Sequence, residues 1–398
     1  MKTVDSKVTV VAIVAVLVYG CVSYPLQNMQ DRLPVFDLTK KYPEMIFDRN
    51  NPDSEYVPDS EYVQLEYTNE ALADFDFRII YLSDKRIVGI NTSRGDILIF
   101  GRDGKVISTF NRTGNSGIDY LRINSIVFDE KNKEIFIADN SYLNRCVVYT
   151  EDGKFLRQFY FPENSWIADI YNFNDSLLLA YNDVNYHVEF IDDSNSGNIN
   201  QVMPYAFISK QDGSLASRLN LSFSERISDT RIISRIQTGE NVEVTSFGFG
   251  GPHRNVKFGN KFVISDISSD TVFLLTQDKM LTPLFVRSPS VFGSDRNQEM
   301  DFALLAHFKT DRFLFFVVEH RNWGKAIEQI KKGQQTDPTP MPQFVFDMHD
   351  GNFFSIGRGG PIGTLIDAPV NTMVFKRHPA NSENEKIELN PMVVIQKW

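Results

Sequence analysis

The stretch that decides the fold is KEIFIADNSYLNRCVVYTEDGKFLRQF, from Lys133 to Phe159. It contains three short apolar runs separated by two polar turns, and the second turn holds Asp152-Gly153. Short apolar runs between turn residues are typical of β-strands. Asp-Gly is typical of a tight hairpin, because glycine adopts the positive φ that such a turn requires. The stretch is therefore predicted to be a β-meander, and the fold depends on whether the chain repeats it.

The chain does repeat this unit. Each copy has a run, a polar turn, a second run that usually ends in Asp or Asn, a loop, a third run, a hairpin turn and a fourth run. The hairpin turn recurs at Asp103-Gly104, Asp152-Gly153, Asp212-Gly213, Asp278-Lys279 and Asp350-Gly351. Four-stranded units at a period of about 40–70 residues indicate a β-propeller. A β-sandwich, the alternative, would show strands without this repeating order.

The two ends of the chain predict how the ring closes. After LIDAPVN and TMVFKRH, the sixth unit has one strong run left, NPMVVIQKW, and so lacks a fourth strand. The early run YVQLEY, Tyr62 to Tyr67, can supply that strand beside the C-terminal one. We predict an all-β fold over residues 59–398, a six-bladed β-propeller of four-stranded antiparallel blades. The N-terminal strand would pair with the C-terminal strand, because closure removes two open sheet edges.

Three stretches carry a resemblance to a known family: TGNSGIDY (Thr113–Tyr120), FDEKNKEIFIAD in the second unit, and the terminal NPMVVIQKW. The units resemble NHL-like repeats, and the chain is similar to the six-bladed β-propeller lipoproteins of Bacteroides-type bacteria. The first stretch departs from the usual Gly-Pro-Gly-Glu-Tyr form, because it keeps Gly114, Gly117 and Tyr120 but has Ile118-Asp119 before the tyrosine. The resemblance covers roughly residues 60–398. It implies the fold and an envelope location, and no activity.

The first 20 residues predict a signal peptide, with Lys2 and Lys7 ahead of the apolar run Val8–Val18. That run is too short to span a bilayer, which needs about 20 apolar residues, but it suits a secretory segment. It leads into Val18-Tyr19-Gly20-Cys21, which resembles a bacterial lipobox and implies a lipid on Cys21. The alternative is an ordinary signal peptide with an incidental cysteine.

Residues 21–58 predict a tether, because they are polar, contain prolines and show no periodicity. The hexamer PDSEYV occurs there at 52–57 and again at 58–63. The residues after Cys21 carry no charge before Asp31, which favours a periplasm-facing protein over a surface-exposed one. With Cys21 lipidated, Cys146 is the remaining thiol, and its apolar run predicts a small buried hydrophobic residue.

The loop-rich face is predicted to bind the ligand. In a propeller, the loops between strands two and three lie on the same face as the loops between blades, around the channel mouth. Blade five has a long insert at Arg321–Pro342, where GKAIEQIKKG predicts a short amphipathic helix. The insert would be either a lid over the mouth or a cap on the blade edge. The segment between blades three and four is expected to be a loop packed closely on the ring.

Arginines and aromatic side chains that converge on a concavity suit a glycan, a peptide or an acidic ligand. The candidates for ligand contact are Arg112, Tyr120, Trp166, His253, Arg254, His320 and Trp323. Such residues are also common in the inter-blade loops of any propeller.

Sequence signatures of catalysis are absent. The six histidines are scattered, and no HExxH, Gly-x-Ser-x-Gly or Walker-type glycine loop occurs. The second runs of the units end at Asn91, Asp139, Asp183, Asp266 and Glu319. These side chains either accept hydrogen bonds from neighbouring loops or form a ring that holds calcium in the channel. We expect no cofactor, with channel calcium as the alternative.

The prediction for function is a lipid-anchored, non-catalytic envelope propeller that recognises a protein, peptide or glycan at its loop-rich face. The net charge of −10 argues against nucleic acid as the partner, because phosphate binding needs a basic surface. Since other NHL-like propellers are enzymes, the resemblance also allows a metal-dependent lyase or hydrolase with its site at the central channel. A purely structural part of an envelope complex is a third interpretation. No sequence feature names the ligand.

Overall fold

The computed structural model divides the chain into two compact units, Met1–Leu33 and Pro34–Trp398. It describes residues 33–47, 58–68, 73, 76–139, 144–162, 165–182, 204–223, 226–227, 230–238, 241–248, 253–291, 301–321, 323–336, 341–357, 367–377 and 391–398. The predicted signal peptide and Cys21 lie outside these residues. Among them, no helix has the length and apolar character needed to cross a membrane.

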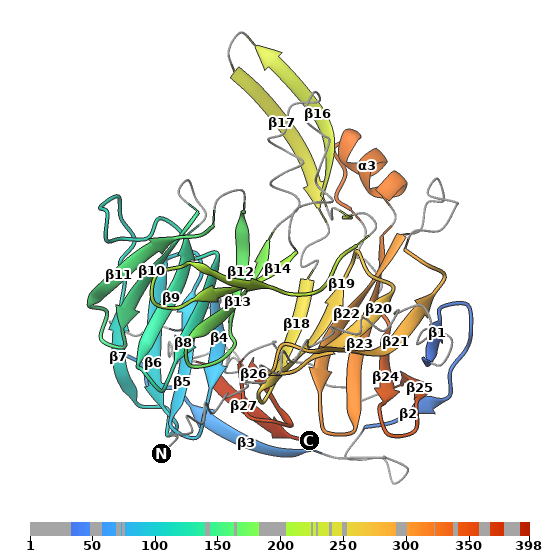
Figure 1. The fold of residues 1–398 in the computed structure, drawn as a ribbon, viewed down its shortest axis with the longest axis horizontal. Helices are drawn as coiled ribbons and strands as arrows, with labels where there is room; N and C mark the ends of the chain where they lie inside the picture. The colour runs from blue at the N-terminus through green and yellow to red at the C-terminus, as the bar shows by residue number, and fades with distance from the viewer. Residues whose placement is uncertain are drawn as a thin grey trace, which may run out of the picture. The chain divides into compact units, whose positions relative to one another are not determined.

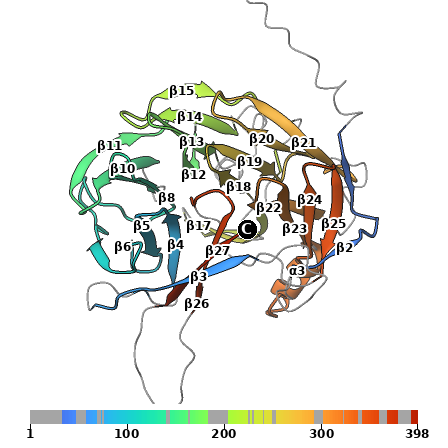
Figure 2. The ribbon, with the colours of Figure 1, turned by 90° about the horizontal axis from the view of Figure 1, so that it is seen from below.

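The second unit is a six-bladed β-propeller, as the sequence predicts (Figures 1 and 2). Blade one is β4 (Phe77–Leu82), β5 (Arg86–Asn91), β6 (Asp96–Gly101) and β7 (Val106–Phe110). Blade two is β8 (Ser125–Asp129), β9 (Glu134–Asp139), β10 (Arg145–Thr150) and β11 (Phe155–Tyr160). Blade three is β12 (Ile167–Asn172), β13 (Leu177–Asn182), β14 (Tyr205–Ser209) and β15 (Leu215–Arg218).

The remaining blades follow the same antiparallel order. Blade four is β18 (His253–Phe258), β19 (Lys261–Asp266), β20 (Thr271–Leu275) and β21 (Leu281–Ser288). Blade five is β22 (Asp301–Lys309), β23 (Phe313–Arg321), β24 (Gln343–Asp347) and β25 (Asn352–Ile356). Blade six is β26 (Thr372–Arg377), β27 (Met392–Lys397) and β3 (Asp59–Gln64) among the described residues.

The predicted closure of the ring is confirmed. Strand β3 pairs antiparallel with β27, from Gln64 opposite Met392 to Asp59 opposite Lys397. The strand begins at Asp59, three residues earlier than the run YVQLEY suggested, because β27 offers partners along six residues. The second PDSEYV hexamer therefore forms most of a strand, whereas the first hexamer lies outside the described residues.

Blades contact one another through the hairpin turns predicted from sequence. All five turns have the expected positive φ at their second residue, which is Gly104, Gly153, Gly213, Lys279 or Gly351. Each turn in blades one to four rests on the outer strand of the preceding blade. A Cβ on Gly104 would lie 2.1 Å from the Gln64 carbonyl oxygen of β3, so a side chain does not fit there. Glycine is required at this turn both by conformation and by space.

The hydrophobic core consists mainly of six clusters, each between two neighbouring blades. The second strands of blades one to four are buried along five consecutive residues because both of their faces meet a blade. Cys146 lies in the cluster between blades two and three, fully buried, which confirms its predicted role as a small core residue. Burial raises the pKa of its thiol well above the usual range, so the thiolate is disfavoured.

Residues 34–47, here called the N-terminal strap, lie on the outer edges of blades four and five. β1 (Val35–Asp37) adds to β21 in parallel, and β2 (Glu44–Met45) adds to β25 in parallel. Phe36 is 0% exposed and packs among Tyr42, Phe316, Phe344 and Phe353. The sequence predicts a tether here because the apolar residues of this stretch show no period. In the structure they instead pack into two seams: Phe36 lies between blades four and five, and Phe47 lies between blades five and six.

The alternation of strand directions gives the ring two distinct faces. The starts of first and third strands lie on the same side as the ends of second and fourth strands. We call this side the loop face, and the side with the hairpin turns the turn face. Both large insertions lie on the loop face: the hairpin of β16 (Thr230–Thr238) and β17 (Asn241–Gly248), and α3 (Trp323–Lys331) (Figure 1).

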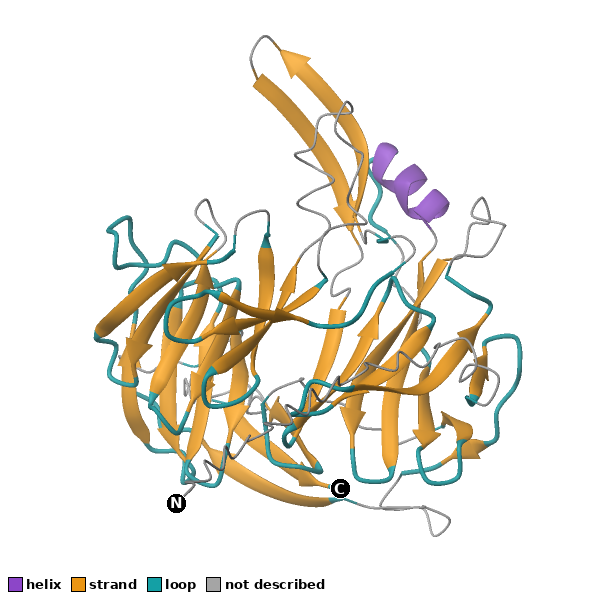
Figure 3. Cartoon of the chain, in the orientation of Figure 1, coloured by secondary structure: helices purple, strands orange, loops and turns teal. Residues whose placement is uncertain are grey.

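Helix α3 confirms the predicted helical insert, and it is the one helix among the described residues (Figure 3). It is followed by Gly333 with φ 69°, the predicted stop. The segment between blades three and four was expected to be a close-packed loop, and that expectation is wrong. It contains a two-stranded antiparallel hairpin that pairs with no other described strand. The β-branched residues of TRIISRIQT and NVEVTSFG explain the two strands.

Candidate functional site

The candidate site is a cavity of about 420 Å³ in the central channel. The first strands of four blades line it, β4, β8, β12 and β18, together with Asp367 from the segment before β26. Its polar and charged lining residues are Arg78, Asn124, Ser125, Asp169, Tyr171, Asn172, Asn255, Lys257 and Asp367. Isoleucine and valine side chains from the same strands separate them. A concave site of this size with a few polar groups among apolar ones is typical of small-ligand binding.

Asp367 and Lys257 form an ion pair across the channel. The Lys257 Nζ lies 2.5 Å from Asp367 Oδ2. The backbone of Asp367 is held by blade one, since its N–H donates to the Ile80 carbonyl at 3.1 Å and its carbonyl accepts from the Leu82 N–H at 2.9 Å. Burial raises the pKa of the Asp367 carboxyl, and the Lys257 charge opposes that rise. The pair therefore links blades four, six and one and neutralises one cation of the cavity.

Arg78 differs from Lys257 in having no counter-ion among the residues that the structure describes. Its side chain is exposed in the cavity, whereas its neighbours Phe77 and Ile79 are buried in the cluster between blades six and one. Side chains on a strand alternate between its two faces, which explains the contrast. No described residue pairs with the Arg78 guanidinium, which carries five N–H donors.

Asn255, on β18 of blade four, carries a hydrogen-bond donor that has no acceptor among the described residues. It is 5% exposed, and its Nδ2 is buried without a hydrogen-bond partner among the described residues. Its Oδ1 accepts a long hydrogen bond of 3.4 Å from the Tyr205 hydroxyl. Leaving a buried donor unpaired costs about 1–3 kcal/mol, so this N–H is a natural contact for a ligand oxygen.

A second polar cluster lies at the turn face between blades two and three. The buried Lys210 donates from Nζ to Asp129 Oδ2 at 2.6 Å and to Asn172 Oδ1 at 2.8 Å. Burial works to raise the pKa of the Asp129 carboxyl, but the hydrogen bonds and charge of Lys210 hold it below its usual value. These hydrogen bonds join blades two and three and pair the buried Lys210 charge with Asp129.

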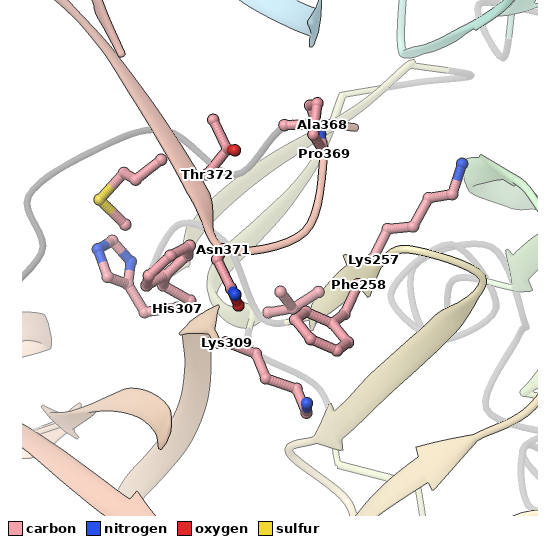
Figure 4. A pocket seen from close by; sticks show the side chains of 11 residues that line it. Lys257, Phe258, His307, Lys309, Ala368, Pro369, Asn371 and Thr372 are labelled. Atoms are coloured by element: carbon pink, nitrogen blue, oxygen red, sulfur yellow. The ribbon is translucent and has the colours of Figure 1, made fainter. Parts of the chain in front are cut away.

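A small pocket of about 20 Å³ lies between blades four, five and six (Figure 4). Lys309 lies beside it, with its Nζ 3.4 Å from the centroid of the Phe258 ring and 2.9 Å from the Thr310 carbonyl oxygen. Burial lowers the pKa of Lys309 to about 8. The volume accommodates about one water molecule, so this pocket is too small for an organic ligand.

Two of the predicted site residues have structural roles. Tyr120 is 0% exposed, and its hydroxyl donates to the Gly95 carbonyl at 2.6 Å and accepts from the Arg112 N–H at 3.1 Å. Burial raises its pKa to about 12. The exposed Arg112 donates from Nε to the Gly153 carbonyl in the turn of blade two. Neither side chain lines the cavity, because both connect blade one to blade two near the outside of the ring.

The other predicted residues lie on the loop face, at separate places around the ring. Trp166 precedes β12 and is half-buried, and its backbone N–H donates to Asn182 Oδ1 at 2.7 Å. His253 and Arg254 begin β18 beside the cavity-lining Asn255. His320 lies near the end of β23, with its ring 6.2 Å from that of Phe302. Trp323 begins α3.

The carboxylates predicted at the ends of second strands are buried and mostly bound within the protein. Asp139 accepts from the Leu121 N–H at 3.1 Å and from Arg145, and Asp266 accepts from the Ser268 N–H at 2.8 Å. Asp183 lies outside the described residues. Among the residues that the structure describes, no group of three or more His, Cys, Asp and Glu side chains is arranged to hold a metal.

Sequence reasoning missed the cavity residues, although a signal existed. Arg78, Asp169 and Lys257 each interrupt an apolar first run of a repeat unit, in FRIIYL, IADIYN and HRNVKF. The first strand of a blade lines the channel, so a charged residue in that run faces the cavity. The site residues predicted from sequence lie in the loops and at strand ends instead.

A ring of six blades around a polar cavity defines the class of protein, a six-bladed β-propeller. The chain belongs to the family described as Domain of unknown function (DUF4934), whose model matches residues 35–397. No curated protein matches the chain.

Several solved bacterial structures are similar to the chain. One from Bacteroides fragilis NCTC 9343, named a "Putative exported protein", has a TM-score of 0.55 at 12% identity and covers 91% of this chain and 99% of that one. A member of the DUF4221 family from Bacteroides vulgatus has a TM-score of 0.46 at 10% identity, covering 85% and 96%. Virginiamycin B lyase from Staphylococcus aureus has a TM-score of 0.39 at 12% identity, covering 85% and 100%. At 12% sequence identity, the likeness to the Bacteroides fragilis structure concerns the fold alone.

Proposed function

We propose that this chain is a lipid-anchored, non-catalytic binding propeller of a bacterial cell envelope. It holds a protein, peptide or glycan at its loop face. One observation carries the proposal: the β16–β17 hairpin and α3 both rise from the loop face of the ring whose channel contains the polar cavity (Figure 1).

The contrast between the two faces supports this assignment. On the turn face, the tight hairpin turns of blades one to four are occupied by packing against the preceding blade. On the loop face, α3 buries Ala326 but leaves Lys325, Glu328 and Lys331 exposed. Long connections in a compact domain are usually functional, and here they are confined to one face.

The envelope location rests on the sequence and on one neighbour. The apolar run and the lipobox-like Val18–Cys21 support export and lipidation, and the resemblance to NHL-like propeller lipoproteins points the same way. The Bacteroides fragilis structure is named as exported. The neutral residues after Cys21 support a periplasm-facing protein.

The binding proposal is tested by site-specific photocrosslinking in the source organism. A photoreactive amino acid replaces Lys325 on α3 or, as the matched control, the exposed Met280 in the hairpin turn of blade four. We expect a discrete crosslinked product from position 325 and none from position 280. Equal labelling at both positions, or no product at 325, would contradict a partner at the loop face.

The anchor is tested by Cys21→Ser. Loss of the lipid should move the protein from the membrane fraction to the soluble fraction and abolish labelling by a radioactive fatty acid. A Cys146→Ser variant serves as the control and should remain in the membrane fraction. An unlabelled native protein would refute lipidation.

A further inference from the structure

We infer that the central cavity binds the oxyanion group, a carboxylate or a phosphate, of a small sugar-sized ligand, with Arg78 as the main contact. The inference deepens the proposed function by naming the chemistry recognised on the propeller axis. It concerns the channel, whereas the partner proposed above lies at the loop face.

Arg78 differs from the arginines that form ion pairs between strands and blades. Arg157 forms a bidentate pair with Glu134, Arg86 pairs with Glu151, and Arg145 binds Asp139. Arg78 has no partner among the described residues, although it lies in a cavity with walls on several sides. A planar guanidinium in that setting is well suited to bidentate binding of a carboxylate or a phosphate.

Asn255 supplies a second donor to the same cavity. Its Nδ2 is buried without a partner among the described residues, on a strand that lines the cavity. A buried N–H without an acceptor is destabilising, and a ligand oxygen would satisfy it. Arg78 from blade one and Asn255 from blade four thus line the same cavity, with the Asn255 Nδ2 donor buried in its wall.

The charges of the other residues that line the cavity indicate what the ligand carries besides its oxyanion. Asp367 neutralises Lys257 through the 2.5 Å ion pair, so Arg78 is the cation of this lining without a counter-ion among the described residues. The Asp169 carboxylate also lines the cavity and would repel a bare multivalent anion. A ligand with one oxyanion and otherwise neutral hydroxyl groups suits this lining. The volume of about 420 Å³ suits a molecule the size of a monosaccharide.

The test uses isothermal titration calorimetry on the purified full-length protein with three probes that share one sugar ring. Glucuronate carries a carboxylate, glucose 6-phosphate carries a phosphate, and glucose carries neither. We expect saturable binding of at least one anionic probe, at least tenfold tighter than glucose. The preference between the two anionic probes identifies the oxyanion.

Two matched arginine substitutions locate the binding. Arg78→Gln should weaken the anionic probe at least tenfold, whereas Arg218→Gln should leave it unchanged. Arg218 lies exposed on the outer strand β15, and no described residue pairs with its guanidinium either. Asn255→Asp should weaken binding as well, because it replaces a donor with a second carboxylate.

Equal effects of the two glutamine variants, or no preference for either anionic probe over glucose, would overturn the inference. If Arg78→Gln does not fold, Arg78→Lys replaces it, and loss of the planar fork should still weaken binding at least threefold. Failure of the probes while position 325 still crosslinks overturns this inference and leaves the proposed function intact. Probe binding without a crosslink at 325 supports the inference and contradicts the proposed partner at the loop face.

Discussion

The first three blades and the last three blades are built differently. Blades one to three consist of four-stranded units with a tight Asp-Gly turn, and the turns of blades two and three rest on the preceding blade. Blades four and five carry a fifth, parallel strand supplied by the N-terminal strap, and blade six takes β3 as its outer strand. The β16–β17 hairpin and α3 also lie in this second half, before blade four and inside blade five.

The difference shows how the two halves of the ring are held together. In the first half, each blade is completed by residues close in sequence, such as the Phe110 side chain against Gly153. In the second half, the seams between blades are filled by distant residues, including Phe36 in one seam and Phe47 with Trp398 in the next. The half with the external support also carries the β16–β17 hairpin and α3.

The largest effect is expected from removing Met392–Trp398. Strand β27 lies between β26 and β3, so its loss leaves β3 without a partner and removes Val393, Ile395 and Trp398 from two clusters. We expect the truncated protein to lose cooperative thermal unfolding, measured by circular dichroism and calorimetry. A cooperative transition at the native temperature would show that closure does not hold the two halves together.

The second test asks whether the strap supports the later blades. Phe36→Ala removes a fully buried aromatic ring and should lower the free energy of unfolding by about 3–5 kcal/mol. Its neighbour Val35 is 50% exposed, so Val35→Ala should change stability by less than about 0.5 kcal/mol. Urea denaturation measures both. Equal small effects would mean that the strap lies on the blades without stabilising them.

The third test uses the buried Lys309 of blade five, whose pKa is lowered to about 8 from an ordinary 10.5. Below pH 8 the folded state holds a buried charge, and the free energy of unfolding should rise as the pH increases from about 8 to 10. The unfolded chain binds more protons in that range. Lys309→Met should remove the rise and stabilise the protein at pH 7 by up to about 3 kcal/mol. A destabilised variant with an unchanged pH slope would contradict this account.

The smallest effect is expected from replacing the glycine of one hairpin turn in each half of the ring. Gly153 and Gly351 have similar φ values of 77° and 73°. A Cβ on Gly153 would lie 2.5 Å from the Phe110 ring, whereas the nearest atom to a Cβ on Gly351 is 3.5 Å away in Pro34. Gly351→Ala should therefore cost about 1 kcal/mol for the φ alone, and Gly153→Ala about 1–2 kcal/mol more. Identical losses in urea denaturation would show that the Phe110 contact adds nothing to the cost of a side chain at Gly153.

Much of the fold could be predicted from sequence because its signals are local. The five hairpin turns are each set by a dipeptide between two apolar runs, and each has the predicted positive φ. The α3 helix follows from the spacing of Ala326, Ile327 and Ile330. The missed β16–β17 hairpin was also local, but the glycines and phenylalanines beside its two β-branched runs are equally typical of a packed loop.

The site was harder to predict because it is assembled from distant strands. Arg78, Asp169 and Asn255 lie more than 80 residues apart in sequence and meet only when the blades close into a ring. Tyr120 has the residue type of a binding aromatic, but the fold uses its hydroxyl to hold Gly95. Residue type alone does not distinguish a side chain that faces the channel from one that faces a seam.

The sequence by itself determined the strands, the turns and their sixfold repetition, because the period of apolar residues and the glycine conformations are properties of short segments. The tertiary structure alone decided which sheet edges the N-terminal strap covers and which charged groups neutralise each other in the channel. It also decided that Arg78 has no counter-ion among the described residues. Those outcomes depend on distances between blades, which are set by packing across the whole ring.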